Sequence, residues 1–397
     1  MKALHRLIRT GLLCAGALAL HAADAMPPAS PASMGRAHPG PPRKPEAVIC
    51  PRAVIDSPDG TKVLRQDFAT VFSDPIQWPE TFRMTNAVKF YVTALAPVFG
   101  LDLARFVKMA SDGGFRAEFE TGGLRPENAA DFNDRTGEKQ ALKELIHLRR
   151  WAEAGGKVDR ITTDHAIMHQ LAMNHRDKNY FNHKTVKLPP GKEHLRFDRT
   201  ALLEELMDYF LTIKAEFPDA KLGVIESLGY FHVTGESGMD YPTTDKRLPR
   251  WDFTEFLDAL LTTASRSGVK IDGFDIDFSH SGSAFDTRRN KGRQLDVGRV
   301  AAAVQACRKR GLEVGIIFND DGGTGPDFRV SKSMTDPGRN RISADNLHAF
   351  QMALEGNQVL PDRIIMQSWS DYPDLTGPES KPGTFFHTAA KLLNAPP

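Results

Sequence analysis

The sequence has little cysteine, almost no net charge and no long hydrophobic run. Among its 397 residues only three are cysteine, and the formal net charge is +1. A chain so close to neutrality lacks the basic surface that nucleic-acid binding requires, so we expect no nucleic-acid partner. Because no apolar run is long enough to cross a bilayer comfortably, we also expect no membrane association of the mature protein.

The amino-terminal segment has the features of a secretory signal peptide. Three basic residues precede an apolar run at 12–20, and the segment ends in the small-x-small pattern Ala23-Asp24-Ala25. We therefore expect residues 1–25 to be removed and the protein to be exported, as a periplasmic or extracellular protein. A lipoprotein anchored through Cys14 is the alternative, although Leu13 stands where such a signal has a small residue.

Residues 26–48 are rich in proline and small residues and lack hydrophobic periodicity. Such a segment cannot bury enough apolar surface to fold. We expect a disordered linker there, followed by one folded domain at 49–397, because no second linker, long charge run or fixed-period repeat follows.

Two cysteines, Cys50 and Cys307, remain once the signal segment is removed. An oxidising compartment would permit one disulfide between them. The alternative is an ordinary buried thiol at Cys307, which lies on an apolar helical stripe with Val300 and Val304. Two cysteines this far apart in sequence do not make a metal site, and we expect neither a metal nor another cofactor.

Short apolar runs alternate with amphipathic helical patterns along the folded part. Several of the helical patterns end in glycine just before the next apolar run, which is the usual helix stop. Strand–helix alternation with short returns indicates a parallel sheet with right-handed crossovers. The predicted strands are at 87–95, 115–123, 158–166, 221–229, 271–279, 312–320 and 363–371, and the predicted helices at 101–114, 138–156, 199–217, 252–268 and 297–311.

This alternation predicts an α/β fold, a single (β/α)8 barrel of the TIM type with enlarged loops. Seven strands are clear, and residues 68–78 are the candidate for an eighth at the front of the barrel. No glycine-rich dinucleotide fingerprint follows the first strand, which counts against an open, doubly wound sheet.

The stretch IDGFDIDFSHSGS at 271–283 places two carboxylates on one face of a strand. Because successive side chains alternate, Asp275 and Asp277 share a face, and the apolar side chains at 274, 276 and 278 share the other. Apolar faces pack on the helices of a barrel, so the aspartates should point inward, with Asp277 nearer the carboxyl-terminal rim where the chemistry of this fold sits. By the same alternation, further polar and aromatic side chains on other strands should point inward, namely Lys89, Tyr91, Glu118, Glu120, Asn319, Gln367 and Trp369.

Several inward carboxylates at one rim predict acid–base chemistry, because neighbouring carboxyl groups spread their pKa values. Glycoside hydrolysis uses one protonated and one ionised carboxyl group beside the scissile bond. We expect Asp277 to be one member of this pair and Asp275, one layer deeper, to support it. Glu226 is the expected partner, as a desolvated general acid. Its facing is ambiguous, and the alternative is that it points outward and caps the following loop, which leaves Glu120 as the next candidate.

Sugar rings present C–H faces and hydroxyl edges, which suit aromatic rings beside polar groups. The residues expected to contact a carbohydrate substrate are Lys89, Tyr91, Asn319, Gln367 and Trp369. Further aromatics fall in or near the expected rim loops, namely Tyr180, Phe181, Tyr230, Phe231 and Tyr372. For any single one of them, a place in the core is the alternative.

The segment DGFDIDF at 272–278 resembles the fourth-strand signature of family 18 glycoside hydrolases, the chitinase-like barrels, whose pattern is DxxDxDxE. Asp272, Asp275 and Asp277 match its aspartates, whereas Ser279 stands where that family has its proton-donating glutamate. The resemblance therefore implies a sugar-handling barrel and not chitinase activity. SWSDYP at 368–373 is loosely similar to the tryptophan-bearing final strands of many glycoside hydrolase barrels.

Three classes of function stay open from the residues. The first is a secreted or periplasmic glycoside hydrolase of a poly- or oligosaccharide, and the second, suggested by Ser279, is a carbohydrate-binding barrel without turnover. The third is a metal-dependent hydrolase of another bond, in which Asp164, His165 and His169 would hold the ion. The loop NDDGGTG at 319–325 lacks the ligand spacing of an EF-hand, and Arg288 and Arg289 form either an anion contact or a solvated surface pair.

Overall fold

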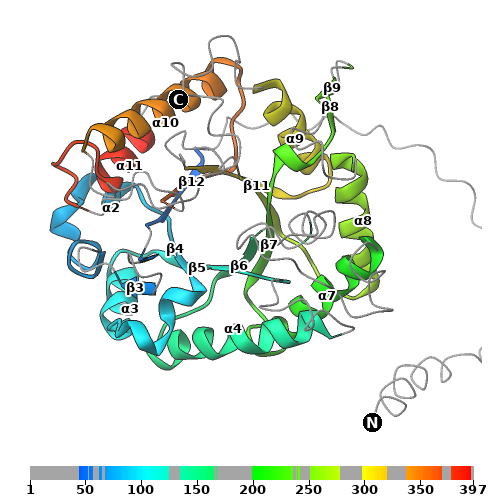
Figure 1. The fold of residues 1–397 in the computed structure, drawn as a ribbon, viewed down its shortest axis with the longest axis horizontal. Helices are drawn as coiled ribbons and strands as arrows, with labels where there is room; N and C mark the ends of the chain where they lie inside the picture. Colours follow the sequence, from blue (N-terminus) through cyan, green and yellow to red (C-terminus); the bar gives the residue numbers. More distant parts are fainter. Residues whose placement is uncertain are drawn as a thin grey trace, which may run out of the picture. The chain divides into compact units, whose positions relative to one another are not determined.

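Eight parallel strands close into a barrel in the computed structural model (Figure 1). The structure describes residues 44–51, 53–56, 62–64, 68–124, 135–164, 167, 199–235, 238, 240–241, 251–277, 297–319, 337–368 and 377–394. Each barrel strand pairs with the barrel strands before and after it in the chain, and the last pairs with the first. In chain order they are β1 (Glu46–Cys50), β4 (Ala87–Tyr91), β5 (Arg116–Thr121), β6 (Arg160–Asp164), β7 (Lys221–Ser227), β10 (Gly273–Asp277), β11 (Glu313–Phe318) and β12 (Arg363–Gln367).

Helices surround the barrel as an outer layer (Figure 1). They are α2 (Pro79–Met84), α3 (Leu103–Asp112), α4 (Thr136–Glu153), α7 (Arg199–Glu216), α8 (Phe253–Arg266), α9 (Val297–Lys309), α10 (Pro337–Gly356) and α11 (Phe385–Asn394). Two small antiparallel pairs, β2 (Val54–Asp56) with β3 (Lys62–Leu64) and β8 (Val233–Thr234) with β9 (Asp240–Tyr241), lie outside the barrel sheet. Short helical turns complete the described part, namely η1 (Phe68–Phe72), η2 (Pro75–Gln77), η3 (Val92–Leu95), η4 (Pro97–Phe99) and η6 (Leu228–Tyr230).

The predicted fold class is confirmed, and all seven predicted strands are barrel strands. The five predicted helices are α3, α4, α7, α8 and α9. The glycine stops behave as expected at Gly268 and Gly311, whose φ values of 70° and 73° lie in the left-handed region. Glycine adopts that region without a steric penalty, so the chain can turn there from helix to strand.

The prediction for the first strand is wrong. Residues 68–72 form a π-helical turn, and the first barrel strand is β1, which begins at Glu46, inside the segment expected to be a linker. Phe72 stacks on Trp78 with ring centroids 5.5 Å apart, and the Trp78 indole donates to the Val71 carbonyl over 3.1 Å. An apolar run that buries its rings in the helix layer looks the same in sequence as a buried strand.

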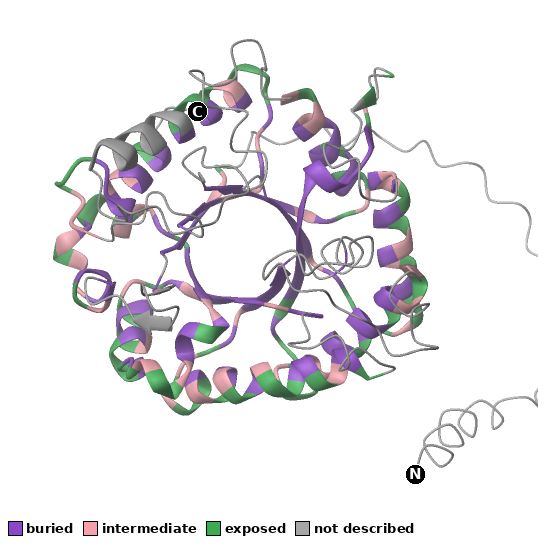
Figure 2. Ribbon diagram, viewed as in Figure 1, coloured by how far each residue is buried: buried purple, intermediate pink, exposed green. Residues whose placement is uncertain are grey.

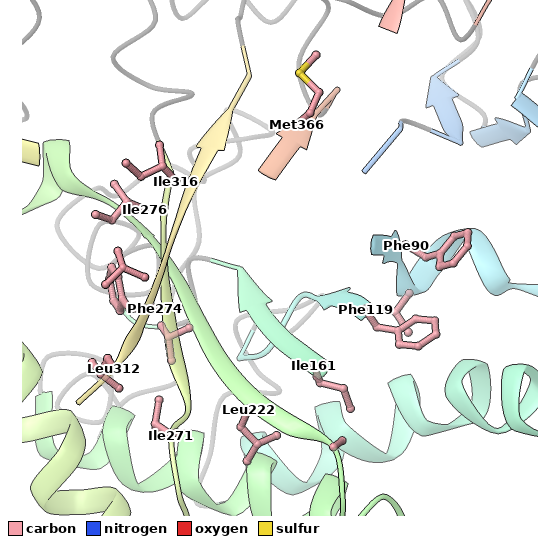
Figure 3. Packing of buried hydrophobic residues seen from close by; sticks show 14 of the residues in the cluster. Phe90, Phe119, Ile161, Leu222, Ile271, Phe274, Ile276, Leu312, Ile316 and Met366 are labelled. Carbon is pink, nitrogen blue, oxygen red and sulfur yellow. The ribbon is translucent and has the colours of Figure 1, made fainter. Parts of the chain in front are cut away.

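Side chains alternate strictly between the barrel interior and the helix layer. Phe274 packs edge-on against Phe253 of α8, and Phe119 packs edge-on against Trp151 of α4, so both face outward as predicted. Figure 3 shows Phe119, Ile161, Phe274 and Ile276 in the cluster of buried hydrophobic residues on these strands. The strands themselves are buried along most of their length (Figure 2).

The interior carries large charged side chains opposite glycines. Arg160, Arg363 and Lys89 are buried inside the barrel, and three neighbouring strands have glycine at inward positions, namely Gly223, Gly273 and Gly315. A Cβ atom on Gly273 would lie 2.7 Å from Arg160 Nη1 and 2.9 Å from the Glu313 carbonyl oxygen. The glycines therefore provide the room that the long cationic side chains occupy.

We expect Gly315→Ala to destabilise the fold by about 2–3 kcal/mol. Its Cβ would overlap the Asp275 carboxylate and lie 2.8 Å from Ile365 Cδ1. Asp275 cannot move aside without losing its bond to Arg363. Urea unfolding of both proteins measures the effect, and Gly356→Ala is the control because a Cβ there meets nothing within 4 Å. Equal stability of Gly315→Ala and the parent protein would show that the interior is not packed as described.

Both cysteines that lie in the described part are buried free thiols, so a Cys50–Cys307 disulfide is not formed. Cys307 lies on α9, and Cys50 is the last residue of β1. Burial raises the pKa of the Cys50 thiol, and the Glu120 carboxylate raises it further. None of the helices in the described ranges has both the length and the apolar composition that crossing a membrane would require.

Candidate active site

The part of the barrel interior toward the amino-terminal ends of the strands holds a buried ionic network. Arg363 donates from Nη1 to Asp275 Oδ1 over 2.7 Å and from Nη2 to Glu118. Lys89 Nζ lies 3.2 Å from Asp275 Oδ2. Arg160 extends the network by its ion pair with Glu313. Each of these cations therefore has a carboxylate partner, which is what burial of so many charges requires.

The ion pairs determine the charge states of the two central groups. Burial alone would raise the pKa of Asp275, but Arg363 and Lys89 outweigh it and hold that pKa at about 2. Burial alone would lower the pKa of Lys89, but Asp275 and Glu120 outweigh it and raise that pKa. Asp275 is therefore ionised and Lys89 protonated at neutral pH.

We expect this network to make stability fall in acid. Because the pKa of Asp275 is lower in the folded state than the 3.9 typical of unfolded chains, its contribution is present above about pH 4. That contribution, about 2 kcal/mol, is lost as the pH falls from about 4 to about 2. Unfolding free energies measured at a series of pH values should show this loss in the parent protein and a smaller loss in Asp275→Asn. An equal acid dependence in both proteins would contradict the ionised state of Asp275.

Above the network, two carboxylate–amide pairs line the carboxyl-terminal ends of the strands. Asn319 donates from Nδ2 to Asp277 Oδ1 over 3.2 Å. Gln367 Nε2 lies 3.1 Å and 3.3 Å from the two Glu120 carboxylate oxygens and 2.8 Å from the Tyr91 hydroxyl oxygen. The two carboxylates come from β10 and β5, with two strands between them around the barrel. All four side chains of the two pairs are at most 6% exposed.

Glu226 is not among these inward side chains, so the expected inward facing is wrong. The β7–β10 register pairs Glu226 with Ile276, whose face packs on the helices, and pairs Ile225 with the inward Asp275. Glu226 is fully buried on the helix side of the wall, where Oε1 accepts the Ile167 backbone N–H over 2.9 Å. The outward facing of the alternative is therefore confirmed, but this carboxylate caps the segment after β6 and not the loop that follows Glu226 itself.

Two other residues expected at the site, Lys89 and Asp275, belong to the buried ion network. Lys89 has no exposed surface and is held between Asp275 and Glu120, whose Oε2 lies 3.7 Å from Nζ. Asp275 contacts Arg363 and Lys89, so its charge is balanced within the network. Phe231 is core: its ring packs on Phe253 and Phe256 of the helix layer.

Some expected site residues lie outside the described residues. These are Trp369, Tyr372, Tyr180, Phe181, Ser279, Arg288, Arg289, His165 and His169. Asp164 is described: it pairs in register with the inward Ile225, at the end of β6. Within the described ranges, no three His, Cys, Asp or Glu side chains are grouped closely enough to hold a metal ion.

Arg160 and Arg363 are interior residues that were not predicted from the sequence. Each is the first residue of a barrel strand, RITTD or RIIMQ, at a position from which alternation points it into the barrel. The inward glycines on the neighbouring strands were the available signal, since a large side chain inside a barrel needs a small one beside it. Asp272, the first aspartate of the family 18 resemblance, precedes β10 and accepts the Leu222 backbone N–H over 3.0 Å.

No family model and no curated protein matches this chain. Its fold is similar to that of several solved structures. The endo-1,4-beta-xylanase XylE of Penicillium canescens matches with a TM-score of 0.43 and 10% identity, over 88% of this chain and 94% of that one. A GH10 endoxylanase from a sugarcane soil metagenome matches with a TM-score of 0.44 and 11% identity, over 89% and 98%. The 3-keto-D-glucoside 4-epimerase of E. coli matches with a TM-score of 0.39 and 12% identity, over 88% and 99%.

Proposed function

We propose that this protein is a glycoside hydrolase that cleaves a poly- or oligosaccharide with Asp277 and Glu120 as its carboxylate pair. The observation that carries the proposal is the two carboxylate–amide contacts at the carboxyl-terminal ends of the strands, whose carboxylates lie on the separate strands β10 and β5. Active sites of this fold lie at that end, and hydrolysis of a glycosidic bond needs two carboxyl groups on opposite sides of the bond.

The two carboxylates have different neighbours, which supports different roles. Lys89 is protonated and lies 3.7 Å from Glu120, so it favours the ionised form of that carboxylate. Glu120 would therefore act as the base or nucleophile. The mechanism then requires Asp277 to carry the proton that the leaving-group oxygen receives. Tyr91, Asn319, Gln367 and Trp369 remain the proposed substrate contacts, whereas Lys89 would act through Glu120.

A panel of oligosaccharides tests the proposal. Purified protein incubated with neutral and acidic glycans should release reducing ends from at least one of them, and a chelator should not change the rate. Binding without release on every glycan would support a carbohydrate-binding barrel instead. Release that a chelator abolishes and a divalent metal restores would support the metal-dependent alternative.

We also propose that the protein is exported. The signal-like pattern at residues 1–25 supports this proposal. Intact-mass analysis of protein from the native host should find residues 1–25 removed, with the chain starting at Met26. A mass that includes Met1 would contradict the proposal, and a lipid adduct on Cys14 would support the lipoprotein alternative.

A further inference from the structure

Each carboxylate–amide pair leaves one amide oxygen without a partner. Asn319 Oδ1 and Gln367 Oε1 take part in no hydrogen bond, and neither does the hydroxyl oxygen of Ser227. The exposed fractions of these residues are only 6%, 3% and 1%. Buried polar atoms nearly always have a partner, so unsatisfied atoms at the functional end of a barrel point to a ligand or to ordered water.

The orientation of both amides follows from their carboxylate neighbours. An ionised carboxylate only accepts hydrogen bonds, so Gln367 must turn its NH₂ group toward Glu120, which lies beside the protonated Lys89. The structure turns the NH₂ group of Asn319 toward Asp277 Oδ1, which leaves Asn319 Oδ1 as the outer atom of that pair. The two amide oxygens are therefore the free ends of the pairs, and they can only accept.

The amide oxygens belong to side chains on neighbouring strands. The β11–β12 register pairs Phe318 with Met366, so the next residues, Asn319 and Gln367, follow at the same level on the inward face. Ser227 lies beside Asp277 in the β7–β10 register. Neighbouring strands are about 4.8 Å apart, a distance that one sugar ring spans with two of its hydroxyl groups.

We propose that Asn319 Oδ1 and Gln367 Oε1 form an acceptor subsite that binds two hydroxyl groups of one sugar ring. This inference rests on the proposed function, and it adds that the protein accepts hydrogen bonds that the sugar donates. Sugar hydroxyls donate hydrogen bonds to the amide oxygens, whereas the carboxylate or sulfate of an acidic sugar offers only acceptors. The subsite therefore takes two free hydroxyl groups of the ring and not the acidic group of a charged sugar.

Deoxy sugars test the subsite independently of turnover. Saturation-transfer NMR would give dissociation constants for methyl glycosides of glucose, galactose, mannose and xylose, and for their monodeoxy forms. At least one parent glycoside should bind, and removal of one of its hydroxyl groups should weaken binding about 10-fold or more, because the buried acceptor is then left unpaired. If no parent glycoside binds, or if every deoxy form binds as well as its parent, the subsite does not exist.

A substitution separates recognition from packing. Gln367→Lys keeps a donor toward Glu120 and removes the acceptor oxygen. In a folded variant the parent glycoside should bind as weakly as its deoxy form, and the deoxy form should bind as it does to the wild-type protein. Gln305→Lys on the exposed face of α9 is the control and should change neither constant. A uniform loss for both ligands would assign Gln367 a structural role only.

The outcomes distinguish this inference from the proposed function. Discrimination between parent and deoxy glycosides without release of any product would retain the subsite and end the hydrolase proposal. Release of product without such discrimination would retain the hydrolase and end the subsite. If Gln367→Lys does not fold, the deoxy series on the wild-type protein still decides.

Discussion

Asp277→Asn is expected to lower turnover of the best glycan about 10²- to 10⁴-fold while leaving the fold intact. The amide can still contact Asn319 but carries no transferable proton, and loss of a positioned acid or base has an effect of this size. Glu120→Gln is expected to act equally strongly, since it removes the ionised carboxylate beside Lys89. Initial rates at saturating glycan, with circular dichroism to check folding, measure both effects.

The control for these two variants is Asp112→Asn. Asp112 is an exposed residue of α3 that pairs with Lys108, so its substitution should leave the rate unchanged. Near-full turnover by folded Asp277→Asn would exclude that residue from the chemistry. If only Glu120→Gln keeps its rate, the partner of Asp277 is another carboxylate, and Asp164 on β6, the strand next to that of Glu120, becomes the next residue to test.

Arg363→Met is expected to destabilise the protein by about 3–5 kcal/mol. The substitution removes the cation that bonds Asp275 and Glu118, and it leaves both carboxylates buried with less compensating charge. The loss should appear in urea unfolding as a lower midpoint with a similar slope. A double variant that also carries Asp275→Asn should lose less than the two single losses added together, because the two residues share one interaction.

Arg83→Met is the matched control for this prediction. Arg83 forms an exposed ion pair with Glu80 one turn away on α2, and such pairs contribute about 0–1 kcal/mol. A small effect at both positions would mean that the interior ion network does not hold the barrel together. A large effect at Arg363 alone would confirm that the buried cation is the one that matters.

Much of the barrel could be predicted because alternation with a period of two is a local property of the chain. In DGFDIDF the apolar and acidic side chains alternate without interruption, and the structure places Asp275 and Asp277 inward, as expected. The strands RITTD and RIIMQ were predicted instead from their place between amphipathic helical patterns. Their boundaries were also clear, because glycine or proline precedes or follows the helices between them.

Glu226 shows where this reasoning fails. In KLGVIES the inward positions hold Gly223 and Ile225, which are as apolar as the neighbouring outward positions. The pattern therefore does not show which side chains of this strand face inward. The facing of Glu226 is set by the register with β10, which no local window of sequence contains. Arg363 and Glu118 likewise meet across 245 residues of chain, so their ion pair could not be predicted from spacing.

The dependence of kcat/KM on pH is the measurement that tests whether Asp277 and Glu120 are the catalytic pair. On the best glycan of the panel, the wild-type protein should give a bell-shaped profile that reports one base and one acid. Glu120→Gln should lose the acidic limb, because the base that must be deprotonated is gone, and Asp277→Asn should lose the alkaline limb, because the proton donor is gone. If both limbs survive in both variants, Asp277 and Glu120 are not the catalytic pair.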